Sequence, residues 1–193
     1  LMLSLCTAFA GYCIHFTGTE SGGFHLYGDS SMGKSTALNI AASVYGDENY
    51  VGDWNLTEAA FEELAESRNN GFLPLDELVM IDTKAKNAAE KRQKLIYALS
   101  DGQGKGRAAS YQGRRATWHL TVLSNGESAM EQHAMEGDLE RKNGERARLV
   151  DVPADAGHGM GIFDSLPDDT TPAQYAEKLK NACRDNHGVA ETK

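Results

Sequence analysis

The stretch GFHLYGDSSMGKSTALNIAASVYG, residues 23–46, decides the fold class of this 193-residue chain. A short apolar run leads into Gly28-x-x-x-x-Gly33-Lys34-Ser35, and a segment with helical apolar spacing and no Gly or Pro follows. A strand, a glycine-rich turn and a helix in this order are typical of loops that wrap around phosphate groups. We therefore expect an α/β domain that binds a nucleotide.

Each position of this loop has a chemical reason. Gly28 and Gly33 let the backbone turn tightly, so that successive N–H groups and the helix N-terminus face the phosphates. Lys34 is expected to reach the β- and γ-phosphates, and the Ser35 hydroxyl to ligate Mg²⁺. The predicted nucleotide-binding residues, a Walker A set, are Gly28, Asp29, Ser30, Ser31, Met32, Gly33, Lys34, Ser35 and Thr36. A glycine-rich turn with a surface lysine is the alternative interpretation.

An apolar strand that ends in acidic residues, a Walker B pattern, is the second expected element of a nucleotide site. GFLPLDEL, residues 71–78, provides it, with Asp76 as a Mg²⁺ ligand and Glu77 as the base that polarises the attacking water. Such a base favours hydrolysis over phosphoryl transfer to another acceptor. Pro74 must occupy a bulge or a position that needs no N–H, because proline cannot donate to the sheet ladder. A simple strand-end turn is the alternative for the Asp-Glu pair.

TWHLTVLSNGE, residues 117–127, predicts a further strand, ending in Ser124 and Asn125. Next to the phosphate loop, the Asn125 side chain would hydrogen-bond the attacking water or the γ-phosphate, although Asn-Gly is also an ordinary turn. Arg146 and Arg148 precede another apolar strand. One interpretation makes them an arginine finger for a neighbouring subunit's γ-phosphate, and the other makes them capping or ion-pairing residues.

Charge is distributed unevenly in this chain, whose net charge is −9. Residues 84–115 contain nine Lys or Arg and two acidic residues, a local charge of +7, which leaves −16 for the rest of the chain. KAKNAAEKRQK has the composition of a solvated helix face, whereas the glycine-spaced GQGKGRAASYQGRR is typical of a loop that follows a phosphate backbone. We expect this basic loop, residues 101–116, to contact nucleic acid.

The length and an apolar content of 40% fit one domain, and no repeat or interdomain linker divides the chain. Alternating strands and helices predict an α/β layer architecture. The expected helices lie near residues 2–16, 34–45, 57–68, 86–100, 128–142 and 172–186, and the expected strands near 24–27, 72–75, 117–123 and 147–151. Thr171 and Pro172 are expected to cap and begin the last helix.

The apolar segment LMLSLCTAFAGYCIHF, residues 1–16, is too short to span a membrane and lacks the basic start of a signal peptide. We expect a buried helix with Cys6 and Cys13 on one face, in an internal domain of a longer protein. Three cysteines without a CxxC pair or a His/Cys cluster of metal-binding spacing predict a reduced, cytoplasmic protein.

These motifs together resemble a known family. GFHLYGDSSMGKSTALNIAASVYG, LPLDEL, LSDGQGKGRA, WHLTVLSNGE and RLVDVPADAGHGMGIF look like the successive blocks of domain of unknown function 927 (DUF927), over essentially the whole chain. Members are P-loop ATPase modules of prophages, plasmids and integrative elements, commonly joined to primase-type domains. The family is similar to AAA-like ATPases and to superfamily III and MCM-type replicative helicases. The resemblance implies a single AAA-like P-loop NTPase domain over residues 1–193, with a parallel sheet sandwiched by helices, working in a ring-shaped DNA motor.

By position, the resemblance assigns Lys34 and Ser35 to the phosphates and Mg²⁺. It makes Asp76 and Glu77 the carboxylates that contact the metal and the water, and Asn125 the sensor.

The same resemblance favours Arg148, directly before LVDVPAD, over Arg146 as the finger. The basic loop falls where helicases of that type carry a DNA-contacting hairpin before the sensor strand. The nucleic-acid candidates are Lys105, Arg107, Arg114 and Arg115.

The expected function is Mg²⁺-dependent ATP hydrolysis that drives DNA translocation or unwinding in mobile-element replication. The expected partners are single-stranded DNA, further copies of the chain in a ring, and primase-type domains of the same protein, without a membrane. A nucleotide-driven assembly or regulatory ATPase that does not translocate is an alternative, and a P-loop small-molecule kinase is another. ATPase assays without an acceptor, and unwinding assays, separate the three.

Overall fold

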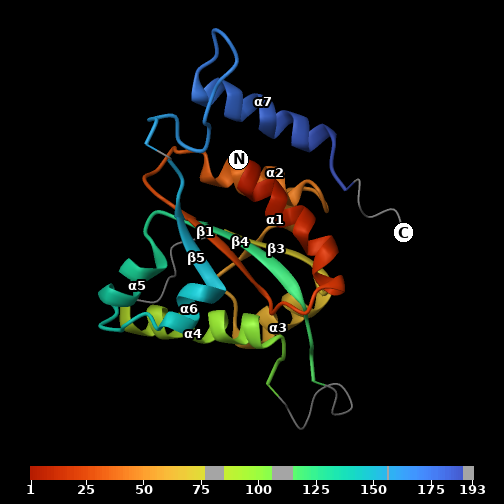
Figure 1. Ribbon diagram of the computed structural model, residues 1–193, viewed down its shortest axis with the longest axis vertical. Helices are drawn as coiled ribbons and strands as arrows, with labels where there is room; N and C mark the ends of the chain where they lie inside the picture. Colours follow the sequence, from red (N-terminus) through yellow and green to blue (C-terminus); the bar gives the residue numbers. More distant parts are fainter. Residues whose placement is uncertain (77–84, 106–114, 156, 189–193) are drawn as a thin grey trace.

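The computed structural model describes residues 1–76, 85–105, 115–155 and 157–188. Helices and strands alternate along the chain, as the sequence pattern predicted (Figure 1). The α-helices are α1 Met2–Cys13, α2 Lys34–Ala42, α3 Glu58–Ser67, α4 Ala85–Asp101, α5 Met130–Glu136, α6 Asn143–Arg148 and α7 Pro172–Asp185. The strands are β1 Gly22–Tyr27, β2 Gly52–Asp53, β3 Gly71–Asp76, β4 Leu120–Gly126 and β5 Leu149–Pro153. Short 3-10 helices, η1 Ile14–Phe16 and η2 Glu48–Tyr50, precede β1 and β2.

Within the described residues, five strands form one parallel sheet in the order β2-β3-β4-β1-β5. β4 lies beside β1, with Asn125 opposite Leu26, which brings Asn125 close to the 28–35 loop that follows β1. Parallel strands bring their carboxyl ends to one edge of a sheet, where ligands of α/β proteins bind. That edge here collects the 28–35 loop after β1, Asp76 at the end of β3 and Asn125 near the end of β4.

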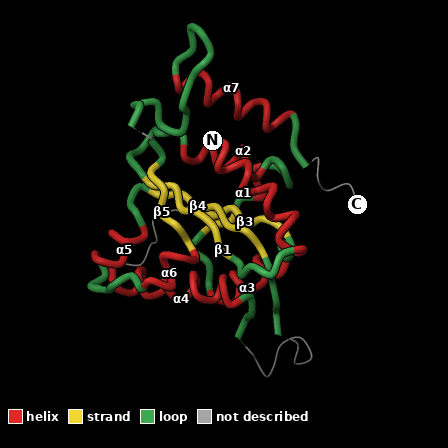
Figure 2. The backbone as a smooth tube through the Cα atoms, in the orientation of Figure 1, coloured by secondary structure: helices red, strands yellow, loops and turns green. Residues whose placement is uncertain are grey.

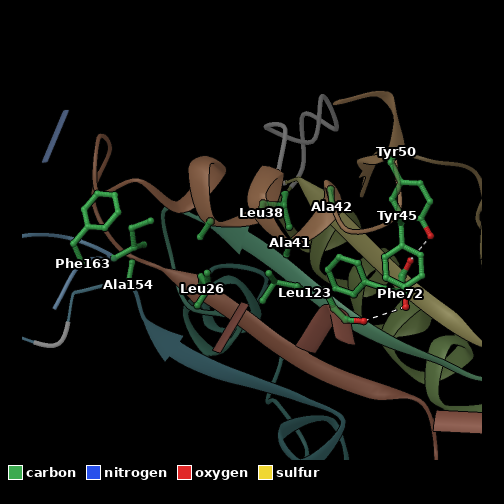
Figure 3. Packing of buried hydrophobic residues seen from close by; sticks show 13 residues of the cluster. Leu26, Leu38, Ala41, Ala42, Tyr45, Tyr50, Phe72, Leu123, Ala154 and Phe163 are labelled. Carbon is green, nitrogen blue, oxygen red and sulfur yellow. Dashed lines mark hydrogen bonds between the residues drawn. The ribbon is translucent and has the colours of Figure 1, made fainter. Parts of the chain in front are cut away.

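Helices cover both faces of the sheet, which gives the predicted α/β sandwich (Figure 2). α1 and α2 pack on one face, α3 to α6 lie on the other, and α7 is outermost beyond α2 (Figure 1). Alternate strand residues supply two cores, because successive side chains leave opposite faces of a strand. On β4, Leu123 packs in the core beneath α2, and Val122 packs in the core beneath α4. Figure 3 shows the first of these cores around Leu38 and Phe72.

α1 is not the buried helix that its apolar sequence predicted, because it buries only one face. The residues that it buries are small: Ser4, Thr7, Ala8 and Gly11. They let the helix approach the sheet closely, and a Cβ on Gly11 would lie 2.7 Å from the Gly71 carbonyl carbon. Of the large apolar side chains, Met2 and Phe9 are exposed, Phe9 to 56%, whereas Leu3 and Tyr12 are partly buried against the core beneath α2. Cys6 and Cys13 are both exposed and free, on one face as expected.

The helix expected at 128–142 is shorter in the structure. α5 ends at Glu136, since Asp138 takes a left-handed backbone conformation (φ 55°) that stops a helix. A separate helix, α6, begins at Asn143 and was not predicted. The next strand therefore starts at Leu149 rather than at residue 147.

Two strand predictions also change. β2 was not predicted, because a two-residue strand is too short to show an alternating pattern. The strand expected at 117–123 runs from Leu120 to Gly126, so Ser124 and Asn125 lie inside it rather than at its tip.

Thr171 and Pro172 do cap and begin α7, where Thr171 and Gln174 form a capping box.

Pro74 lies in β3, a strand that is paired on both sides. The hydroxyl of Tyr50 donates to the Phe72 carbonyl oxygen (3.0 Å), drawn as a dashed line in Figure 3, so this side of β3 faces the chain before β2. Pro74, two residues further on, presents its nitrogen to the same side. β2 begins only at Gly52, opposite Leu75. The proline thus occupies a position that needs no N–H, as the sequence required.

An antiparallel stem precedes β4, at the amino edge of the sheet and away from the 28–35 loop. Gln103 and Thr117 form an isolated bridge in it. The described ends of the predicted basic loop therefore belong to a hairpin stem, with the Gly104 N–H donating to the Ala116 carbonyl oxygen (2.9 Å). Arg107 and Arg114 lie in residues 106–114, outside the described part of the chain.

Candidate functional site

The 28–35 loop joins β1 to α2 through residues with positive φ. Ser31 has φ 67° and Gly33 has φ 83°, and Gly33 is the N-cap of α2. A Cβ on Gly33 would lie 2.9 Å from Cγ1 of Ile162, so the position favours glycine for its conformation and for its space. The first N–H groups of a helix have no partners within it. The start of α2 and the loop therefore form an anion-binding geometry.

Lys34 is buried and reaches back into the curve of this loop. Its Nζ donates to the carbonyl oxygens of Gly28 (2.6 Å) and Asp29 (2.7 Å). The ammonium group is thus held within the loop that is expected to surround the phosphates. A phosphate oxygen at the mouth of the loop would receive a charge-assisted hydrogen bond from the same nitrogen.

Ser35, Asp76 and Asn125 come together beside the loop. Asn125 Nδ2 lies 3.3 Å from Ser35 Oγ, and all three residues line one open cavity of about 400 Å³. A hydroxyl and a carboxylate are hard oxygen ligands, and Mg²⁺ is usually held by one or two such protein groups together with substrate phosphates and water. No cluster of three or more His, Cys, Asp or Glu side chains suited to a metal occurs in the described part of the chain. Ser35 and Asp76 are described groups at this cavity that could hold Mg²⁺ together with the phosphates of a nucleotide.

The predicted loop residues divide into two groups. Gly28 and Asp29 contact Lys34 through their carbonyls, and the cavity-lining members are Ser30, Ser31, Met32, Gly33, Lys34, Ser35 and Thr36. Glu77, the expected base, directly follows β3 but lies outside the described residues. Its role stays a prediction.

The segment after β5 supports the loop, a contact that the sequence did not indicate. The Ile162 N–H donates to the Met32 carbonyl oxygen (3.0 Å). Gly161 has φ +61°, and a Cβ there would lie 2.3 Å from the same oxygen. The glycine spacing of GHGMGIF was the available signal, but it indicated only a connection between elements.

α7 forms the outer wall of the cavity with residues at helical i, i+3, i+4 and i+7 spacing. They are Ala173, Ala176, Glu177 and Lys180. The helix is held there by apolar contacts, including Tyr175 against Phe163 (5.1 Å between ring centres) and Leu179 against the core beneath α2. Lys180 is thus a second cation at the cavity. The sequence analysis predicted this helix at residues 172–186 but gave it no site residue.

The family model described as Domain of unknown function (DUF927) matches residues 1–118, more than half of the chain. The chain belongs to the DUF927 family. A solved structure described as "SCCmec type IV Cch - active helicase" is similar to it, with 25% sequence identity and a TM-score of 0.62. That similarity covers 96% of this chain and 30% of the helicase chain, so the DUF927 domain spans about a third of that protein's length. No curated protein matches the chain.

Arg148 lies at the amino edge of the sheet in this DUF927 domain, far from the loop of its own chain. It precedes Leu149, which is opposite Gly23 at the start of β1, whereas the loop begins after Tyr27 at the other end of that strand. Within one chain, Arg148 cannot contact a phosphate held by Lys34.

Arg148 packs against the end of α4. Its Nε donates to the Ser100 hydroxyl, and its guanidinium carbon lies 5.4 Å from the ring centre of Tyr97. Desolvation, followed by the charge of Glu145, raises the pKa of Tyr97, and the positive charge of Arg148 acts in the opposite direction. Its Nη1 donates to the Gly144 carbonyl oxygen (3.2 Å), and its Nη2 lies 3.9 Å from a carboxylate oxygen of Glu20, so the capping or ion-pairing interpretation is observed for Arg148 within its own chain.

Arg146 forms a bidentate pair on the surface. Its Nε and Nη2 each donate to a carboxylate oxygen of Glu131 (both 2.9 Å). These hydrogen bonds lower the pKa of Glu131 and raise the pKa of Arg146. Ion pairing, the interpretation left open for Arg146, is therefore observed.

Lys105 and Arg115, the described members of the basic set, line a groove of about 700 Å³ at the amino edge. The acidic residues that line the same groove are Glu20, Glu58, Glu62 and Asp101. Lys105 Nζ donates to Glu58 (2.5 Å), and its backbone N–H donates to Glu62 (3.0 Å). Arg115 donates to the side-chain oxygen of Gln103 (2.9 Å). In the described residues, the charge of Lys105 is thus already paired.

Over the ranges that the structure describes, no helix is both long enough and apolar enough to cross a membrane.

Proposed function

We propose that this DUF927 domain is the Mg²⁺-dependent, ATP-hydrolysing motor of a helicase that acts in mobile-element replication. The observation that carries the proposal is the meeting of Lys34, Ser35, Asp76 and Asn125 around one cavity at the carboxyl edge of a parallel sheet. The similarity to a helicase over nearly the whole chain supports the same function.

In this proposal each residue has one task. Lys34 and the N–H groups of the loop bind the β- and γ-phosphates, and Asn125 orients the attacking water or the γ-phosphate. Ser35 and Asp76 hold Mg²⁺, which neutralises charge on the phosphate oxygens. Glu77 takes the proton of the attacking water.

The assembly follows from the position of Arg148. Because Arg148 cannot contact the nucleotide of its own chain, we propose that it contacts the nucleotide of the next subunit in a ring. Single-stranded DNA would then be bound at the amino edge by the basic loop, through Lys105, Arg107, Arg114 and Arg115. Primase-type domains of the same protein belong to the same proposal through the family resemblance, and a cytoplasmic location belongs to it through the cysteine content.

The ATPase rate of the chain with Mg²⁺, measured with and without single-stranded DNA, tests this function. The expected result is turnover that needs no acceptor other than water and that DNA increases. Lys34→Ala should abolish ATP binding, whereas Lys178→Ala, an exposed lysine on α7 that does not line the cavity, should leave it unchanged. Glu77→Gln should bind ATP and lose about 100-fold or more in rate. Equal rates in the parent and in Lys34→Ala would contradict the proposal.

A further inference from the structure

A buried chain of hydrogen bonds lies directly behind the cavity and links three strands. Its members are Trp54 after β2, Ser124 in β4 and His25 in β1, each 0% exposed. Trp54 Nε1 is 3.0 Å from Ser124 Oγ, and Ser124 Oγ is 2.7 Å from His25 Nδ1. His25 Nε2 is 3.0 Å from the carbonyl oxygen of Ser128, in the turn after β4.

The chemistry of these groups determines the direction of the chain. The Ser128 carbonyl can only accept, so His25 Nε2 carries a hydrogen and donates it. If the ring is neutral, Nδ1 accepts the hydroxyl hydrogen of Ser124, and Ser124 Oγ accepts the indole N–H of Trp54. A buried hydrogen-bond network of this kind favours one placement of its members, because displacing one of them breaks a hydrogen bond in the buried interior.

The two faces of β4 connect this network to the site. Leu123 packs in the core beneath α2, so Asn125, two residues later, points to the same face and contacts Ser35. Ser124 lies between them and points to the opposite face, toward His25. The residue held by the network is therefore the immediate neighbour of the residue that contacts the first turn of α2.

Trp54 extends the network to the third site strand. Its backbone N–H lies 3.4 Å from the carbonyl oxygen of Asp76, the last residue of β3. His25 belongs to the strand that leads directly into the 28–35 loop. The side chains of the network thus connect β1 and β4, and the backbone of Trp54 connects them to the end of β3.

We propose that Ser124 is a positioning residue, which together with His25 and Trp54 fixes the placement of Asn125 relative to Ser35. The inference rests on the proposed ATPase function. Loss of the Ser124 hydroxyl leaves Lys34, the loop and the ladders of β4 intact, but removes the side-chain hydrogen bonds that orient the backbone next to Asn125. The rate of hydrolysis should therefore fall by about tenfold or more, as for other groups that orient a site residue, while affinity for ATP changes little.

Ser124→Ala is compared with Ser21→Ala, a matched control. Ser21 is also buried, and its hydroxyl oxygen accepts the N–H of Leu120 (3.0 Å), but at the amino edge of β4. The expected result is a loss of kcat with unchanged ATP affinity in Ser124→Ala only. His25→Gln, which keeps a donor and an acceptor, should retain more kcat than His25→Leu. Equal loss of kcat in the two serine variants would overturn the positioning role.

A second measurement detects the network without any enzymatic activity. The chain has two tryptophans, and the indole N–H of Trp118 donates elsewhere, to the Leu99 carbonyl (3.0 Å). In ¹⁵N-labelled protein, Ser124→Ala should shift the indole resonance of Trp54 and leave that of Trp118 in place. An unchanged Trp54 resonance would refute the network. If the Trp54 resonance shifts in Ser124→Ala but the parent chain shows no ATP turnover, the network stands. The ATPase proposal is then refuted, and the positioning role with it.

Discussion

Replacing Arg148 with Ala tests whether the nucleotide site is shared between two subunits. Within one chain, Arg148 lies beside the start of β1, and residues 23–27 of that strand separate it from the loop. At a strand rise of about 3.3 Å per residue this separation is about 16 Å, longer than an arginine side chain. Any effect of Arg148 on phosphate chemistry must therefore act on a neighbouring subunit.

The size of the effect follows from the role. An arginine finger supplied in trans increases the turnover rate about a thousandfold or more and changes ground-state binding little. Arg148→Ala should therefore bind ATP like the parent and hydrolyse it about a thousandfold more slowly. In an equal mixture with Lys34→Ala, about one interface in four of a head-to-tail ring combines an intact Lys34 with an intact neighbouring Arg148. About a quarter of the parental rate should return.

The assay is ATP turnover per subunit, measured for each variant alone, for the mixture, and over a range of protein concentrations. Arg146→Ala is the matched control, because it lies two residues earlier and pairs only on the surface with Glu131. Thermal unfolding must accompany the rates, since Arg148→Ala also removes the hydrogen bond to Ser100. A mixture no more active than its components, with a rate independent of concentration, would refute the shared site.

The remaining predictions concern α7, the basic loop and the segment after β5. Lys180→Ala should weaken ATP binding about three- to tenfold through the loss of one charge-assisted phosphate contact, whereas Lys178→Ala should not; equal affinities would remove α7 from the site. Glu58→Gln should tighten single-stranded DNA binding, because it releases Lys105 from its ion pair. Lys105→Ala should weaken DNA binding and lower the slope of log affinity against log salt concentration by about 0.7. If both variants bind DNA with the parent's affinity and salt slope, Lys105 is not a DNA contact. Gly161→Ala should destabilise the domain by about 1–3 kcal/mol in chemical denaturation, since its Cβ would lie 2.3 Å from a carbonyl oxygen of the loop; an unchanged unfolding midpoint would contradict that contact.

Contiguous features could be predicted from the sequence. The order of strand, loop and helix around residues 28–35 is confirmed, because the turn depends on glycines within the segment itself. The N-cap Thr171 is confirmed for the same reason, since a cap contacts only the next turn of its own helix. The prediction that position 74 needs no backbone N–H also follows from the sequence, because proline lacks this group in any fold.

Contacts between distant segments could not be predicted in this way. Lys180 lies at the cavity because α7 packs on α2, and nothing near residue 180 in the sequence indicates that contact. The charge of Lys105 marked a nucleic-acid loop, but its pairing with Glu58 depends on where α3 lies. Trp54 and His25 were not singled out in the sequence, because they meet only where the sheet places Ser124 between them.

The sequence by itself determined the phosphate-type loop, the parallel α/β class and the family of this protein. The shape of a glycine-rich loop and the periodicity of a strand or helix are set by neighbours along the chain. Only the tertiary structure decided which strand ends share an edge, that Asp76 and Asn125 meet Ser35 there, and that Arg148 lies a strand's length away. Such contacts depend on strand order and helix packing, which result from the burial of both cores together and not from any local pattern.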